Sequence, residues 1–210
     1  MLDLDRRIGE IRQRVSSTGP FLRARTDAER SARQLLDARA GFFTTEDLAR
    51  FLDLCNTELV PPNVSDEFRA SETRTRFQLA FIGQNRCLML RTVEECNKWI
   101  ALLWKDRTDE LGTLGSFWRS SRIKGAGTGL PTMILYLKHP ETYSVWLGFL
   151  SEALSSVAGQ ELPSSRTVPD YLRYNQAVDT QLRKRFAVQP QEIDYILYRL
   201  LAEGSLRGKP

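Results

Sequence analysis

Apolar residues recur at helical spacing along most of the chain. Near the start, a narrow apolar stripe predicts a first helix that ends at Gly19-Pro20. The residues of this stripe are Leu4, Ile8, Ile11 and Val15. The pattern predicts a second, arginine-rich helix over 27–40. We expect the two to form an N-terminal helical arm, residues 1–42. The arm is either a hairpin packed on the body or on a partner, or a solvated, partly ordered lead-in.

The clearest helix signal lies in residues 92–105, TVEECNKWIALLWK. Thr92 followed three residues later by Glu95 predicts a capping box. The apolar face carries two tryptophans, a pattern more typical of a core than of a cofactor site. Residues 44–57 predict another helix, because threonines at its start precede acids that favour the helix dipole.

Further helices are predicted over 109–118, 131–138, 143–157, 171–186 and after Gln189, whereas the segment from Ser65 to Asn85 is ambiguous between helix and short strand. The chain contains no series of β-hairpins and no internal repeat of 20 to 50 residues. The predicted fold class is therefore all-α. The expected domain organisation is the arm, a multi-helix globular domain over 43–205 that contains a helix-hairpin-helix-like element, and a tail over 206–210.

Three glycines stand at alternate positions between two predicted helices, in SSRIKGAGTGLP; they are Gly125, Gly127 and Gly129. Glycine tolerates positive φ and has no Cβ, so such a hairpin can turn tightly and present its amides to an anion. Arg119, Arg122 and Lys124 add cations beside it. The alternative is a plain helix–helix turn with a glycine C-cap.

The charge balance permits contact with nucleic acid without requiring it. Lysine and arginine number 30 against 26 acids, which gives a net charge of +4. No apolar run approaches the ~20 residues of a membrane span, and the N-terminus is too charged for a signal peptide. We therefore expect a cytoplasmic protein with no membrane partner.

Residues for polar catalysis are scarce. His139, the single histidine, precedes Pro140 at the end of a predicted helix, where a capping or solvent-facing role is commoner than catalysis. The three cysteines have no metal-site spacing and are expected to be buried thiols; they are Cys55, Cys87 and Cys96. The sequence contains no Walker lysine motif, dinucleotide fingerprint or HExxH. We expect no cofactor, no metal and no catalytic residue.

A longer set of residues carries a family resemblance, and its specific part is the block from Lys124 to Trp146. The matching positions are Phe51, Leu52, Asn56, Phe68, 111–117, 123–127, Thr132, Ile134, Leu135, Pro140, Glu141, Tyr143, Val145, Trp146, Tyr171, Tyr174, Asn175, Ile193, Asp194, Leu197 and Leu200. With these residues in this order, the chain resembles the helical domain that precedes, or is fused to, the AAA+ module of McrB-like restriction ATPases and related defence proteins.

The same block is similar to the hairpin of helix-hairpin-helix DNA glycosylases, in which a GxG turn holds one DNA strand by its phosphates. This resemblance places the family's catalytic aspartate at Leu147 and the lysine of bifunctional members at Gly129. Leucine can neither stabilise an oxocarbenium-like centre nor activate a nucleophile, so base excision is not expected. The McrB-like pattern often has asparagine or aspartate there too, and Leu147 departs from both.

The resemblance implies a non-catalytic nucleic-acid-binding or target-recognition module of a restriction or antiviral defence system. Its expected contacts are Arg119, Arg122, Lys124, Gly125, Gly127 and Gly129. The expected partners are nucleic acid, DNA in the first place, and an AAA+ ATPase or other defence-system subunit.

Two alternatives remain open. One is a protein–protein assembly module, in which the hairpin only packs two helices and the arginine-rich segment from Arg6 to Arg39 binds a partner. The other is a remnant glycosylase or nuclease. A nuclease would need carboxylates such as Asp106, Asp109 and Glu110 to hold Mg²⁺, but a charge run of this kind is usually a solvated face.

Overall fold

The computed structural model describes residues 2–17, 19–55, 83–162 and 165–207. Within these ranges all regular secondary structure is helical, which confirms the all-α prediction. The helices are α1 (Leu2–Ser17), α2 (Gly19–Arg39), α3 (Thr45–Cys55), α5 (Gly83–Leu90), α6 (Val93–Lys105), α7 (Glu110–Ser120), α8 (Gly129–Lys138), α9 (Gly148–Ala158), α10 (Val168–Val178), the π-helical turn η1 (Asp179–Arg183), α11 (Lys184–Phe186), the 3-10 turn η2 (Pro190–Glu192) and α12 (Ile193–Arg207).

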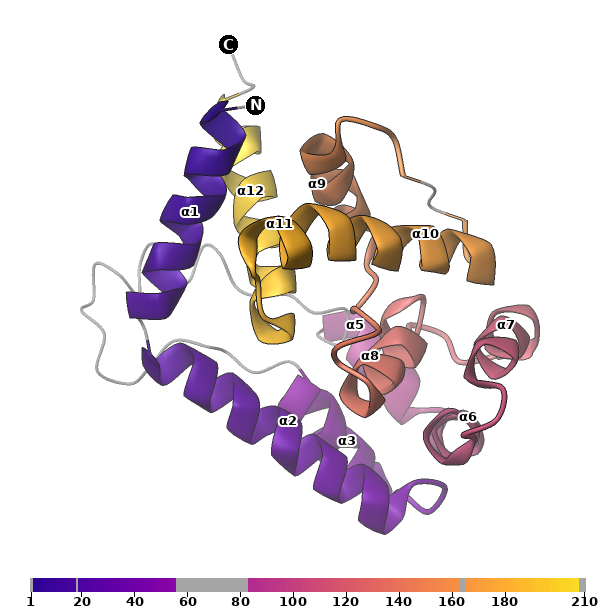
Figure 1. Cartoon of the computed structure of the whole chain (residues 1–210). Helices are drawn as coiled ribbons and strands as arrows, with labels where there is room; N and C mark the ends of the chain where they lie inside the picture. The colour runs from indigo at the N-terminus through magenta and orange to yellow at the C-terminus, as the bar shows by residue number, and fades with distance from the viewer. Residues whose placement is uncertain (1, 18, 56–82, 163–164, 208–210) are drawn as a thin grey trace.

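Helix α8 forms the centre of the fold. Its sequence GLPTMILYLK is apolar on every side, and each residue from Gly129 to Leu137 is buried. A helix that is apolar all round needs neighbours on all faces. Helices α2, α6 and α7 contact it, and Figure 1 shows α8 between them.

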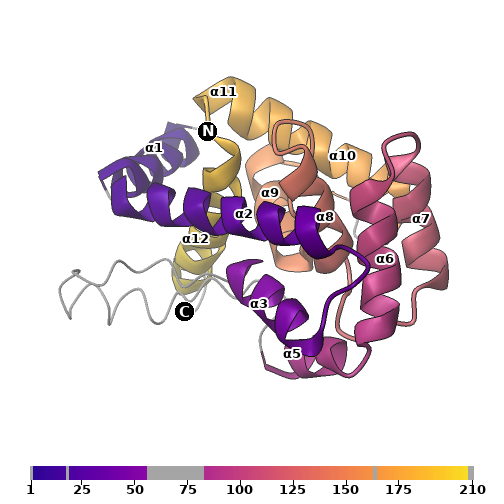
Figure 2. The same ribbon diagram turned by 90° about the horizontal axis from the view of Figure 1, so that it is seen from below.

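The two N-terminal helices contribute to the same core. Ile8 and Ile11 of α1 and Ala32 and Leu36 of α2 are buried within it. Helix α1 lies alongside α12, and α2 lies alongside α3 (Figures 1 and 2). Both helices are therefore packed on the body, which is one of the two arrangements expected from the sequence.

The helix starts show which capping predictions hold. At α3, the Asp47 amide donates to Thr44 Oγ1 at 3.1 Å and the Thr44 amide donates to Asp47 Oδ2 at 3.0 Å, as predicted for a threonine N-cap. At α6, the predicted capping box is wrong. The Thr92 hydroxyl donates to Met89 O at 3.1 Å, and Glu95 accepts from Trp99 Nε1 at 2.8 Å.

One predicted helix begins later than its apolar pattern suggests. Residues 143–147 have no regular secondary structure, and α9 starts only at Gly148. Other boundaries agree more closely, although α2 begins at Gly19 and α12 continues to Arg207. Asn56, Phe68 and most of the ambiguous segment from Ser65 to Asn85 lie outside the described residues.

Candidate nucleic-acid interface

The glycine-rich loop, residues 121–128, connects α7 to α8. Two apolar residues anchor it in the core, since Ile123 is 7% and Ala126 1% exposed. The Leu130 amide donates to Ala126 O at 3.1 Å, which joins the loop to the first turn of α8. The loop is thus fixed at both ends and in its middle.

Each of the three glycines has a different environment. Gly125 has φ +87°, and a Cβ there would lie 2.6 Å from the Asn85 carbonyl oxygen, so only glycine fits against α5. Gly127 has φ +52° with open space around its Cα. Gly129 is buried as the first residue of α8. Within the described structure, none of the three amides donates a hydrogen bond.

The three cations predicted beside the loop are exposed. Arg119 donates from Nη2 to Ser116 Oγ at 3.1 Å. No carboxylate of the described residues lies within 4.0 Å of the charged groups of Arg119, Arg122 or Lys124. Five predicted contact residues therefore reach solvent at least in part, whereas Gly129 does not.

A second part of the block, segment 139–147, follows the C-terminal end of α8 as a turn at 140–142 and an irregular stretch over 143–147. Two threonines of the α8 region bind its backbone: Thr128 Oγ1 donates to Trp146 O at 2.6 Å, and the Trp146 amide donates to Thr132 Oγ1 at 3.0 Å. Thr132 is fully buried. These threonines serve the fold rather than a ligand.

Side chains of α10 satisfy the same segment from the other side. The Ser144 amide donates to Asn175 Oδ1 at 2.7 Å, while Tyr171 OH and Tyr174 OH donate to the carbonyls of Ser144 and Val145 at 2.9 and 3.0 Å. Buried backbone groups must find partners, and here side chains replace the helical ones. This explains why 143–147 is not helical, and sequence periodicity carries no signal for it.

The aromatic residues near this segment belong to the core. Trp146 is 1% exposed and stacks with Tyr171 at a centroid distance of 5.7 Å. Trp118 meets the Trp146 ring edge-on at 5.6 Å, and Tyr143 stacks with Tyr171 at 6.0 Å. Leu147, at the position of the glycosylase aspartate, is a 5% exposed N-cap of α9. Trp146 is therefore a core residue, and Trp118 and Tyr143 are partly buried against that core.

The candidate carboxylates each support the local fold. Asp109 caps α7 by accepting from the Gly112 amide at 3.0 Å. Asp106 accepts from the Thr113 hydroxyl at 2.7 Å and from nearby backbone amides, and these hydrogen bonds lower its pKa. In the part of the chain that the structure describes, no group of three or more histidine, cysteine, aspartate or glutamate side chains could hold a metal ion.

Glu110 is the centre of a small polar cluster at the other end of α7 and α8. It accepts from Lys138 Nζ at 2.7 Å and pairs with His139 Nε2 at 2.9 Å. Burial raises the pKa of Glu110, but hydrogen bonds and charge from Lys138 and His139 outweigh burial and lower it. His139 is the C-cap of α8 and is exposed, as predicted.

A buried ionic network that joins α2, α8 and α12 was not predicted from the sequence. Arg25 donates to Glu29 at 2.7 Å and to Asp194 at 2.9 Å, and Tyr136 OH donates to Glu29 at 2.6 Å. Burial raises the pKa of Asp194 against the opposing effect of Arg25. The i, i+4 spacing of Arg25 and Glu29 was the available signal. Because these charged side chains are about 5% exposed, the network acts within the fold.

The cysteine prediction is correct at two positions and wrong at one. Cys55 and Cys96 are buried, and burial raises the pKa of Cys96 to about 11. Cys87 is exposed because it lies on the outer side of the short helix α5. The buried thiols are therefore packing residues of low reactivity.

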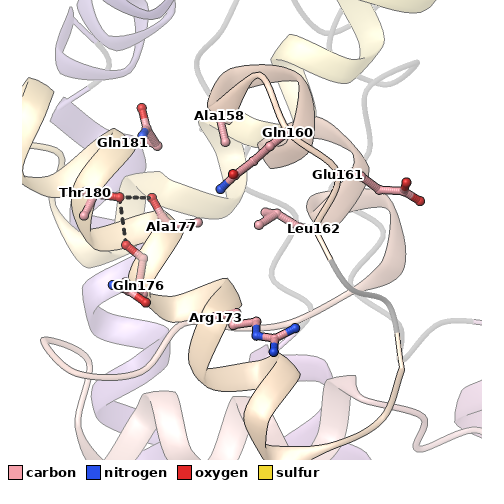
Figure 3. A pocket seen from close by; sticks show the side chains of 9 residues that line it. All are labelled: Ala158, Gln160, Glu161, Leu162, Arg173, Gln176, Ala177, Thr180 and Gln181. Atoms are coloured by element: carbon pink, nitrogen blue, oxygen red, sulfur yellow. Dashed lines mark hydrogen bonds between the residues drawn. The ribbon is translucent and has the colours of Figure 1, made fainter.

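A pocket of about 350 Å³ lies between the end of α9 and α10. Figure 3 shows Gln160 and Leu162 facing Ala177 across it, while Glu161 points away. Among the lining residues, Arg173 is the one cation, and it pairs with Asp170 at 3.7 Å. This pocket brings together no set of acid, base and nucleophile.

No described helix is both long enough and apolar enough to cross a membrane. Comparison with known protein families, curated protein sequences and solved structures finds no match to this chain. The arrangement of residues around the glycine-rich loop is therefore the main structural guide to function.

Proposed function

We propose that the chain is a non-catalytic nucleic-acid-binding or target-recognition module whose glycine-rich loop contacts the phosphate backbone. The observation that supports this best is the combination of Gly127, whose surroundings are open, with exposed cations whose charges no described carboxylate neutralises. Amides without a described hydrogen-bond acceptor and cations without a described carboxylate partner are suited to bind a polyanion.

Within this proposal, the six candidate residues have different roles. Gly127 offers its amide, Lys124 contributes a point charge, and Arg119 and Arg122 contribute planar forks that suit phosphate oxygens. Gly125 lets the loop approach the backbone of α5. Gly129 starts α8 from inside the core and supports the loop without touching the ligand.

The proposed biological context is a restriction or antiviral defence system. It depends on the resemblance of the block from Lys124 to Trp146 to McrB-like proteins. In that setting the nucleic acid is DNA, and an AAA+ ATPase or another defence subunit would act on what this module binds. The proposal assigns no catalytic step to the chain.

The experiment is a titration of labelled duplex and single-stranded oligonucleotides at 50 and 200 mM salt. We expect wild-type binding that weakens as salt rises, because phosphate contacts release counterions. Lys124→Glu should weaken binding about tenfold, and removing the positive charge should lower the salt slope by about 1. Arg30→Glu, a charge reversal at an exposed arginine on α2, is the matched control.

Two outcomes would overturn the proposal. One is absence of wild-type binding at low salt, and the other is an equal effect of Lys124→Glu and Arg30→Glu. Either result would favour the alternative, a protein–protein assembly module in which the loop only connects two helices.

A further inference from the structure

The turn between α2 and α3 holds two adjacent phenylalanines in opposite environments. Phe43 is 4% exposed and packs against Phe51 at a ring-centroid distance of 5.8 Å, whereas Phe42 is 73% exposed. Burying a phenylalanine side chain stabilises a fold by about 1.5–3 kcal/mol. The fold forgoes that stabilisation at Phe42, so its outward position needs an explanation.

The turn is held in place by its neighbours. The Phe43 amide donates to Asn97 Oδ1 at 2.7 Å, and Asn97 Nδ2 donates back to Phe43 O at 2.8 Å. Gly41 has φ +93°, and a Cβ there would lie 3.1 Å from the Ala101 side chain. The backbone is therefore fixed on both sides of Phe42. An aromatic side chain presented from a fixed backbone loses less entropy on binding than one on a mobile loop.

The exposed side of α6 extends this surface. Leu102 is 44% exposed, with Lys98 one turn before it and Lys105 about one turn after it. Lys105 Nζ lies 5.4 Å from the centroid of the Phe42 ring. We call Phe42, Leu102, Lys98 and Lys105 the Phe42 patch.

The Phe42 patch combines two exposed apolar side chains, Phe42 and Leu102, with two exposed lysines. Two carboxylates near it along the chain are already engaged: Asp37 accepts from Trp104 Nε1 at 3.1 Å, and Asp106 accepts from threonine hydroxyls. No described carboxylate lies within 4.0 Å of Lys98 or Lys105 Nζ. Lys98 Nζ lies 5.5 Å from the centroid of the Trp99 ring, so each lysine faces an aromatic ring but has no carboxylate partner among the described residues.

We propose that the Phe42 patch is a docking surface for a protein segment that carries an apolar side chain flanked by acidic residues. The partner's apolar group would cover Phe42 and Leu102, and its carboxylates would pair with the two lysines, as charge complementarity requires. A nucleobase suits the patch less, because stacking needs an open ring face and Lys105 lies over one face of Phe42. This surface shares no residue with the glycine-rich loop.

The test uses a phage-displayed library of 12-residue peptides, with leucine or phenylalanine fixed at the centre and random flanks, selected on the full chain. We expect enriched peptides with an excess of acidic flanking residues. Phe42→Ser and Leu102→Ser should each weaken their binding at least tenfold. Lys105→Glu should shift selection toward basic flanks. Leu172→Ser is the matched control, because Leu172 is an exposed leucine on α10 with 43% exposure.

Several results would overturn the proposal. These are a library that yields no binder, enriched peptides without acidic bias, or peptides that bind Phe42→Ser as tightly as wild type. A dimer in sedimentation that Phe42→Ser converts to monomer would assign the patch to a second copy instead. Oligonucleotide binding lost in Phe42→Ser would assign it to nucleic acid. Because Phe42 is exposed, unchanged near-ultraviolet circular dichroism is expected and separates lost binding from misfolding.

Discussion

The two non-helical segments that flank α8 come from one block of sequence but have opposite environments. In segment 139–147, three consecutive residues, Ser144 to Trp146, are at most 4% exposed, and buried side chains bind their backbone groups. In the glycine-rich loop 121–128, the glycine amides donate to no described residue and the cations are exposed. Ser144 to Trp146 are therefore part of the core, whereas the loop exposes the groups that are proposed to bind.

Under the proposed function, one block of sequence serves both the fold and a ligand. Thr132, Tyr171 and Asn175 are polar residues that the family resemblance included, yet their hydrogen bonds all lie within the fold. Lys124 belongs to the same resemblance, and Arg122 directly precedes the matched residues 123–127. Both side chains are exposed and contribute little to packing. Substitutions in the two segments should therefore affect different properties, stability in one and binding in the other.

The largest effect is expected in the buried segment. Asn175→Ala removes the acceptor of the Ser144 amide and the donor to Tyr171 O, and leaves a buried amide without a partner. We expect a loss of about 3 kcal/mol in the free energy of unfolding, measured by urea denaturation. Gln176→Ala, at the exposed neighbouring position, should change stability by less than about 0.5 kcal/mol. Equal effects of the two substitutions would contradict the structural role of Asn175.

Within the loop, the two glycines with positive φ should differ. Gly125→Ala adds left-handed backbone strain and a contact of 2.6 Å with Asn85 O, so we expect a loss of about 2 kcal/mol. Gly127→Ala adds the strain alone, at about 1 kcal/mol. Thermal unfolding of both variants measures the difference. A Gly127 variant less stable than the Gly125 variant would show that the loop packs differently.

A smaller effect is expected at Glu110, the first residue of α7, which pairs with Lys138 and His139 at the C-terminal end of α8. The pKa of Glu110 is lowered in the folded state, so its charged form adds stability above its unfolded pKa of about 4.5. That stability is lost as pH falls through the lower folded pKa. Glu110→Gln should cost under about 1 kcal/mol at pH 7 and should reduce the loss of stability below pH 4.5. Denaturation at pH 7 and pH 3.5 compares the two proteins, and an unchanged pH dependence would contradict the role of the cluster.

The smallest stability effect is expected at the exposed cations of the loop. Lys124→Glu and Arg122→Glu should change the free energy of unfolding by less than about 0.5 kcal/mol, because surface charges contribute little. The same samples used for oligonucleotide titration provide this measurement. A large loss of stability would place these residues in the fold and remove them from the proposed binding surface.

Several features could be predicted because their physical causes are local. The apolar pattern around Trp99 and Leu103 specifies α6, and Thr44 with Asp47 specifies the start of α3. The capping box predicted at Thr92 does not form, because the Thr92 hydroxyl donates to Met89 O in the preceding helix, α5. Local spacing does not encode this contact. The predicted burial of Cys87 was wrong for a similar reason, since composition alone does not show which side of α5 faces outward.

The sequence by itself determined an all-helical chain, the apolar character of α8 and the position of a glycine-rich bend with cations beside it. Only the tertiary structure decided that Gly129 lies in the core, that residues 143–147 are not helical and that Arg25 joins Asp194 across 169 positions of the chain. The reason is physical. Helical periodicity is set by neighbours within a few residues, whereas burial and the partners of polar groups depend on segments that meet only after the chain has folded.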